Sequence, residues 1–158
     1  MEELTIRAAG PADAGELLTV QRAAYVSEAR LYQYFDLPPL TETLDEVRAA
    51  IATDAVLVAL AGTRIVGGVR GRLAGDTCHV GRLAVAPDLQ GNGVGTALLR
   101  AIEERFPGVP RFELFTGGRS EPNLRLYRRF GYADLPRRPA DHPDLLYLVK
   151  RVSGGAAM

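Results

Sequence analysis

The pattern of apolar residues changes at Pro87, and this change limits the folds open to the chain. Before Pro87, apolar runs typical of strands are separated by the tight turns Gly62-Thr63 and Gly75-Asp76. These runs cover residues 55–60, 65–73 and 77–85. After Pro87, apolar residues recur at helical spacing from Val94 to Phe106. We therefore predict an antiparallel meander of three strands that leads directly into a helix.

Weaker patterns before and after the meander and its helix predict the remaining strands and helices of a single domain. Further strands are predicted at residues 4–7, 111–116 and 144–149. Further helices are predicted at 11–27, after a cap at Thr41 or Thr43, and at 124–130 before Gly131, whereas residues 31–40 are expected to be irregular. This order predicts a mixed sheet with helices on both faces. We place one domain at residues 1–152 and a flexible tail at 153–158.

The composition argues against binding to nucleic acid, metal or membrane. Nineteen Lys and Arg residues balance nineteen Asp and Glu residues, so the chain lacks the basic excess of a nucleic-acid-binding domain. Cys78, His79 and His142 form no cluster with metal-ligand spacing. The N-terminus shows no signal pattern, and no apolar run approaches the roughly 18 residues that span a bilayer. We therefore expect a cytoplasmic protein.

Three glycines, Gly91, Gly93 and Gly95, stand between the third strand of the meander and the following helix. Such a loop can leave several backbone N–H groups free at the positive end of a helix, where an anion binds. Plain turns also use glycine, so both interpretations of the loop alone stay open. A dinucleotide-binding fingerprint needs a strand–helix–strand unit, and a P-loop needs a lysine before its Ser or Thr. The preceding meander and the pair Gly95-Thr96 fit neither.

Two motifs resemble those of the GCN5-related N-acetyltransferases, the GNAT family. Residues 83–99, LAVAPDLQGNGVGTALL, are similar to the family's central motif, whose Gln/Arg-x-x-Gly-x-Gly/Ala signature is met by Gln90, Gly93 and Gly95. Residues 121–132, EPNLRLYRRFGY, are similar to a second segment with an asparagine, a Leu-Tyr pair and a Gly-Phe or Gly-Tyr pair. Together with the order of elements, the resemblance covers about residues 3–150.

The resemblance implies both a fold and a cofactor. The implied fold is α/β (α+β), with a mixed, mostly antiparallel sheet of six to seven strands, helices on both faces and a splayed central strand pair. The implied cofactor is acetyl-CoA: the strand before the loop pairs with the pantetheine arm, and the loop holds the pyrophosphate. The implied binding residues are Leu83, Ala84, Val85, Gln90, Gly91, Asn92, Gly93, Val94, Gly95, Thr96, Asn123 and Tyr127. Asn123 would contact the cofactor or orient Tyr127, with helix capping as the alternative.

The resemblance also implies two catalytic residues. Attack of an amine on the thioester expels a thiolate, and the family assigns its protonation to the tyrosine that is Tyr127 here. Its spacing with Leu124 and Phe130 leaves a packing role open. Some relatives carry a glutamate base eleven residues before the signature, where this chain has His79. His79 could take the proton of the amine, directly or through water, although the departure from glutamate leaves a structural role open. The adjacent Cys78 would face the core on the other side of the sheet.

In this family the first two helices and their connection usually line the acceptor pocket. We therefore expect Tyr25, Glu28 and Tyr32 to bind the acceptor. The nearby Asp36 and Glu42 could also attract a cationic amine, and a solvated acidic loop is the alternative. Several arginines could contact the 3′-phosphate of CoA or simply keep the surface soluble: Arg119, Arg125, Arg128, Arg129, Arg137 and Arg138.

The predicted function is acetyl transfer from acetyl-CoA to a primary amine of a small molecule. The zero net charge and the tyrosine-rich loop favour a small molecule over the second candidate, a protein lysine or N-terminus. A non-catalytic acyl-CoA sensor is the third candidate, and the presence of Tyr127 and Asn123 argues against it. The resemblance also implies a homodimer.

Overall fold

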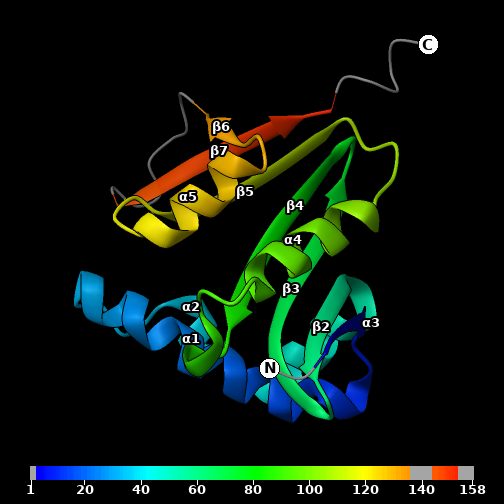
Figure 1. Cartoon of the computed structure of the whole chain (residues 1–158), viewed down its shortest axis with the longest axis vertical. Helices are drawn as coiled ribbons and strands as arrows, with labels where there is room; N and C mark the ends of the chain where they lie inside the picture. The colour runs from blue at the N-terminus through cyan, green and yellow to red at the C-terminus, as the bar shows by residue number, and fades with distance from the viewer. Residues whose placement is uncertain (1–2, 136–143, 153–158) are drawn as a thin grey trace.

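The computed structural model describes residues 3–135 and 144–152, which form a seven-stranded sheet flanked by helices (Figure 1). The strands are β1 (Leu4–Ala8), β2 (Ala55–Ala61), β3 (Arg64–Ala74), β4 (Thr77–Val85), β5 (Arg111–Gly117), β6 (Ala133–Asp134) and β7 (Leu145–Arg151). The helices are α1 (Ala14–Tyr32), α2 (Pro38–Thr41), α3 (Leu44–Thr53), α4 (Val94–Glu104) and α5 (Glu121–Arg129). Two 3₁₀ turns, η1 (Pro11–Asp13) and η2 (Pro87–Leu89), precede α1 and the glycine loop.

The sheet has the order β1-β2-β3-β4-β5-β7-β6, and among its described pairs only β4 and β5 run parallel. Helices cover both faces of the sheet. Successive residues of a strand point to opposite faces, and two neighbouring glycines of β3 show which helix lies on each face. A Cβ on Gly67 would lie 2.9 Å from Leu98 of α4, and a Cβ on Gly68 would lie 2.6 Å from Leu17 of α1. The two glycines thus let α4 and α1 approach the sheet from opposite sides. The predicted mixed, mostly antiparallel sheet with two covered faces is confirmed.

Local sequence explains where the helices begin and end. Thr43 caps α3: its hydroxyl accepts from the Glu46 N–H at 3.1 Å, while the Glu46 carboxylate accepts from the Thr43 N–H at 2.9 Å. Gly131, which follows α5, has a φ of 94°, a conformation that favours glycine. These signals agree with the caps predicted from the sequence.

Three local predictions differ from the structure. Helix α1 continues beyond Ser27 to Tyr32, because Ala29 is fully buried and Tyr32 packs against Gly117. The segment expected to be irregular contains α2, which starts at Pro38. Strand β6 was not predicted, since two residues are too short to show an alternating pattern. The predicted tail, residues 153–158, lies outside the described residues.

The central strands β4 and β5 separate part of the way along their length, as Figure 1 shows. Their pairing covers three positions and ends where His79 lies opposite Glu113. Beyond that point β4 continues to Val85 and β5 to Gly117, with no further pairing between them. On its other side β4 follows β3 with a shift in register, and Arg82 in this stretch has a φ of 53°. The expected splayed strand pair is therefore present.

Candidate functional site

The loop between β4 and α4 presents unused backbone N–H groups at the start of a helix. Gly91 and Gly93 have φ values of 84° and 87°, which glycine adopts without strain. Within the described part of the chain, the N–H groups of Gly91, Gly93, Val94, Gly95 and Thr96, in this loop and the first helical turn, have no hydrogen-bond acceptor. Free N–H groups at the positive end of a helix are suited to phosphate oxygens.

Two carbonyl groups at the unpaired end of β4 already accept hydrogen bonds. The Tyr25 hydroxyl donates to the Leu83 carbonyl at 3.1 Å. The Gln90 side chain donates to the Val85 carbonyl at 3.4 Å and so holds the loop against the strand. A carbonyl oxygen has two lone pairs, and each of these groups can therefore accept a second hydrogen bond from a ligand.

Helix α1 crosses between the two strands of the splayed pair, from β4 to the residues that follow β5. Tyr25, Glu28 and Tyr32 lie about one turn apart and so share one face of the helix. Tyr25 contacts β4, as described above. The Ser120 hydroxyl, just before α5, lies 2.6 and 2.8 Å from the two carboxylate oxygens of Glu28. The three side chains predicted to bind the acceptor therefore lie on one face of α1, which contacts both β4 and the residues that follow β5.

The last of these side chains, Tyr32, packs against the C-terminal end of β5. Its hydroxyl accepts from the Arg119 N–H at 2.7 Å, and the Arg119 guanidinium lies 4.5 Å from the centre of its ring. A Cβ on Gly117 would overlap the Tyr32 hydroxyl and ring. Only glycine at position 117 gives the Tyr32 ring this room, a role that the sequence did not reveal.

Tyr127 is buried on α5, with an exposed fraction of 6%. Its pKa is raised well above the ordinary value of 10, mainly by burial and further by the neighbouring Tyr25 and Glu28. The hydroxyl therefore keeps its proton at neutral pH and is able to donate it. The ring also packs with Tyr132, at 6.1 Å between centres, so Tyr127 contributes to the core as well.

His79 lies at the point where β4 and β5 separate, and it is partly buried. It pairs with Arg72 on β3 and with Glu113 on β5. The preceding residue, Cys78, is fully buried in the core that α4 covers, so alternation places His79 on the α1 side. Burial raises the pKa of the Cys78 thiol to about 11, which keeps it protonated and poorly nucleophilic.

Asn123 is not the residue that caps α5, because Ser120 occupies the N-cap position. No hydrogen bond of the Asn123 side chain is present among residues 3–135 and 144–152, and Asn123 is partly buried. The capping alternative is thereby removed. A contact of Asn123 with the cofactor stays a prediction.

Glu42 has a different role from the one predicted. Instead of facing an acceptor freely, its carboxylate accepts hydrogen bonds from Arg70, Arg82 and Gln21. Neither arginine was singled out from the sequence, because each stands in a strand far from Glu42 along the chain. Ser120 was missed for the same reason. A pattern search within one segment has no signal for such long-range pairs.

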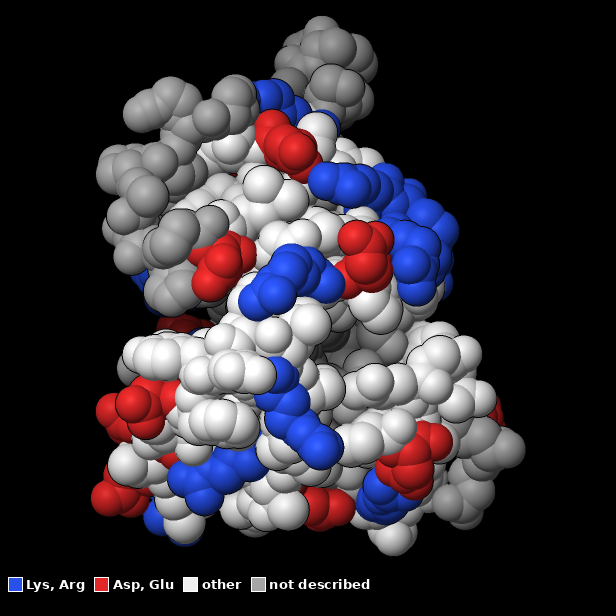
Figure 2. All heavy atoms as spheres, turned by 90° about the vertical axis from the view of Figure 1, so that its left-hand side faces the viewer, with Lys and Arg blue, Asp and Glu red and all other residues white. Residues whose placement is uncertain are grey.

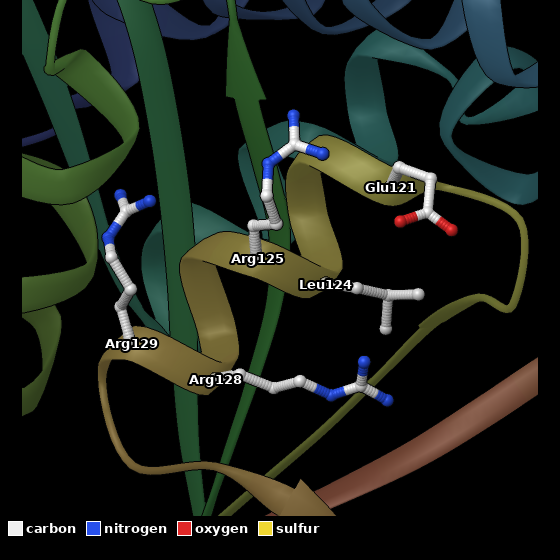
Figure 3. Close-up of a pocket in the computed structure, with 5 residues that line it drawn as sticks. All are labelled: Glu121, Leu124, Arg125, Arg128 and Arg129. Carbon is white, nitrogen blue, oxygen red and sulfur yellow. The ribbon is translucent and has the colours of Figure 1, made fainter.

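Basic side chains form a separate patch along α5. A pocket of about 410 Å³ is lined by Glu121, Leu124, Arg125, Arg128 and Arg129. Figure 3 shows Arg125 and Arg129 extending from one side of α5, while Leu124 and Arg128 point to another. Figure 2 shows basic groups gathered on one side of the upper part of the molecule and a hollow across its middle. Arg137 and Arg138, also considered for the 3′-phosphate, lie outside the described residues.

The described residues contain no group of three or more His, Cys, Asp and Glu side chains that could hold a metal ion. Across residues 3–135 and 144–152, no helix is long and apolar enough to pass through a membrane.

Comparison with known proteins agrees with this geometry. The model of the acetyltransferase (GNAT) family matches residues 22–132, and the chain belongs to this family. An uncharacterized N-acetyltransferase of Methanocaldococcus jannaschii is 30% identical over 94 residues, which are 56% of this chain and 60% of that protein. The chain thus covers less than two thirds of that relative.

Solved structures show the same fold. The PaiA N-acetyltransferase of Thermoplasma acidophilum, in complex with coenzyme A, superposes with a TM-score of 0.83 at 15% identity, covering 95% of this chain and 99% of the other. YncA of Salmonella typhimurium, a putative acetyltransferase with its cofactor acetyl-CoA, superposes with a TM-score of 0.77 at 19% identity. The superposition covers 96% of this chain and 95% of the other. At these identities the likeness establishes the fold alone.

Proposed function

We propose that the protein transfers the acetyl group of acetyl-CoA to a primary amine of a small molecule, by direct attack within a ternary complex. One observation carries the proposal: an unpaired stretch of β4 leads into a helix whose first N–H groups are free. Acetyl-CoA has a matching shape, with an amide-containing pantetheine arm and a pyrophosphate. The family membership and the two neighbours with bound CoA or acetyl-CoA support the same cofactor.

The residues present fit this cofactor. The free N–H groups from Gly91 to Thr96 would hold the pyrophosphate, as the helix dipole favours. The backbone of Leu83, Ala84 and Val85 faces the gap left by β5 and would pair with the pantetheine amides. Bound there, acetyl-CoA supplies an activated thioester. The arginines of α5 would lie near the phosphates of the cofactor, and the Asn123 side chain would make a further polar contact with the cofactor.

Tyr127 would act as the general acid. The amine nitrogen bonds to the acetyl carbon as the carbon–sulfur bond breaks, and the Tyr127 hydroxyl gives its proton to the departing sulfur. Burial and the neighbouring Glu28 support this role because they keep the hydroxyl protonated. Tyr127 then regains a proton from solvent.

His79 would accept the proton that the attacking amine loses. Its position where β4 and β5 part supports this role, because the open side of the site begins there. A histidine can take a proton near neutral pH, directly or through a water molecule. Neither route needs a metal ion.

The position of α1 favours a small acceptor over a protein segment. Tyr25 ties the helix to β4, and Glu28 and Tyr32 tie it to the residues that follow β5. Because these contacts hold α1 across both strands of the splayed pair, a compact acceptor fits the site better than an extended peptide.

The test is a screen of amines, peptides and aminoglycosides with acetyl-CoA. Thiol release is followed continuously, and mass spectrometry identifies the acetylated product. We expect amine-dependent thiol release with matching N-acetylation. Tight CoA binding without turnover across the panel would contradict the proposal and support an acyl-CoA sensor.

A further inference from the structure

Two arginines share one carboxylate on the α1 side of the sheet. Arg70 binds Glu42 with two hydrogen bonds, of 2.9 and 2.6 Å. Arg82 reaches the same carboxylate only through its Nε atom, at 3.3 Å. The exposed fractions of the side chains are 13% for Arg70, 24% for Arg82 and 10% for Glu42, so all three are largely removed from water.

This cluster has an excess of positive charge. Although burial acts to raise it, the hydrogen bonds from Arg70 and Gln21 and the two guanidinium charges lower the pKa of Glu42 to about 2. Glu42 is therefore a carboxylate at neutral pH, and one negative charge faces two positive ones. A third guanidinium, that of Arg22, donates to the Glu42 main-chain carbonyl at 2.8 Å. The excess charge is on Arg82, whose two terminal nitrogens have no hydrogen-bond partner in the described part of the chain.

Arg82 also lies on the unpaired stretch of β4 that forms part of the candidate site. It directly precedes Leu83, in the part of β4 that β5 leaves unpaired. Its φ of 53° is left-handed, which costs a non-glycine residue about 1 kcal/mol or more. Such backbone strain is typical of functional positions rather than of ordinary strands. The strain directs a long cationic side chain toward Glu42 on the side that α1 covers.

A carboxylate, that of Glu28, lies on the same face of α1 as Tyr25. The Tyr25 hydroxyl donates to the carbonyl of Leu83, the residue that follows Arg82, at 3.1 Å. Glu28 accepts a hydrogen bond from the hydroxyl of Ser120, which precedes α5, the helix that carries Tyr127. The face of α1 that bears Tyr25 thus has a cation with free donors at its β4 end and an anion at its α5 end.

We propose that the acceptor amine also carries a carboxylate, as an amino acid does, and that Arg82 binds this carboxylate. The fork of Arg82 nitrogens matches a carboxylate, while Glu28 attracts the amino group toward Tyr127. The assignment rests on the proposed function and narrows its substrate class. The phosphates of CoA do not account for the free charge on Arg82, since the N–H groups that suit them belong to the α4 loop.

The test compares matched acceptors. The standard amino acids are assayed beside their α-carboxamides and the amines left by decarboxylation, with acetyl-CoA saturating. For the best acceptor we expect kcat/KM to be about 10- to 100-fold higher for the free acid than for its carboxamide. Arg82→Gln should reduce this ratio to near one, chiefly by raising the KM of the acid, and Arg82→Lys should retain part of it. The KM for acetyl-CoA should not change in either variant.

Controls separate the two levels of the claim. Arg48→Gln, an exposed change on α3, should leave all rates unaltered, and thermal unfolding shows whether each variant is folded. Acetylation of acids and carboxamides at equal rates would overturn this inference and leave the proposed function standing. Acetyl transfer to none of these acceptors would overturn this inference, and the absence of turnover across the wider screen of amines as well would overturn both. A preference for acids that survives Arg82→Gln would show that another group binds the carboxylate.

Discussion

Replacing Tyr127 with phenylalanine separates a catalytic hydroxyl from a packing ring. The hydroxyl has no hydrogen-bond partner in the described part of the chain, so Tyr127→Phe should change the free energy of unfolding by less than about 1 kcal/mol. The loss of a general acid should lower kcat by about 10²- to 10⁴-fold, with little change in the KM for acetyl-CoA. Steady-state thiol release and urea unfolding, measured on the same preparation, check both expectations.

Tyr132→Phe is the matched control, because Tyr132 is also buried and packs against Tyr127. Its hydroxyl donates to the Glu103 carboxylate at 2.7 Å. Losing a hydrogen bond to a charged group should cost about 1.5 to 3 kcal/mol of stability while kcat stays near the wild-type value. Retention of full activity by Tyr127→Phe, or an equal loss of kcat in both variants, would refute the general-acid assignment.

Three further changes follow from the structure. His79→Gln should flatten the rise of kcat/KM with pH that a histidine base produces; an unchanged profile would remove His79 from the reaction. Gly117→Ala should destabilise the fold by about 1 to 3 kcal/mol, because the new methyl group overlaps Tyr32, whereas Gly118→Ala, with its nearest contact at 3.5 Å, should be nearly neutral in urea unfolding. Glu42→Gln should cost about 2 to 3 kcal/mol by breaking partly buried ion pairs. The lowered pKa of Glu42 means that its contribution is complete above the ordinary value of 4.5 and is lost as pH falls toward about 2. Glu42→Gln has no carboxylate to protonate at this position, so its free energy of unfolding should fall less than that of the wild type as pH is lowered. Identical acid unfolding curves for the two proteins would contradict this account.

Local patterns predicted most of the fold because each strand and helix carries its own signal. The glycine turns, the alternating strands and the helical spacing after Pro87 depend on neighbours in the sequence. The extension of α1 depends on Gly117, far along the chain, and therefore could not be predicted from residues 28–32 alone. Strand β6 is too short to carry a pattern.

The candidate site was predicted where a motif extends over consecutive residues and missed where side chains meet across the fold. The glycine loop has the free N–H groups expected of it, and Tyr25, Glu28 and Tyr32 share one face of α1. Glu42 was expected to attract an amine, yet two strand arginines neutralise it. The homodimer and the cytoplasmic location stay predictions.

Binding of acetyl-CoA to the splayed strands and the glycine loop is the central claim, and calorimetric titration tests it most directly. Acetyl-CoA is compared with S-acetylpantetheine, which lacks the pyrophosphate, on the wild type and on Gly93→Ala. Gly93 has a φ of 87°, so alanine would strain the loop and displace its N–H groups. We expect the change to weaken acetyl-CoA binding at least about tenfold and to leave S-acetylpantetheine binding unaltered. Equal weakening of both ligands, or of neither, would contradict the claim that this loop holds the pyrophosphate.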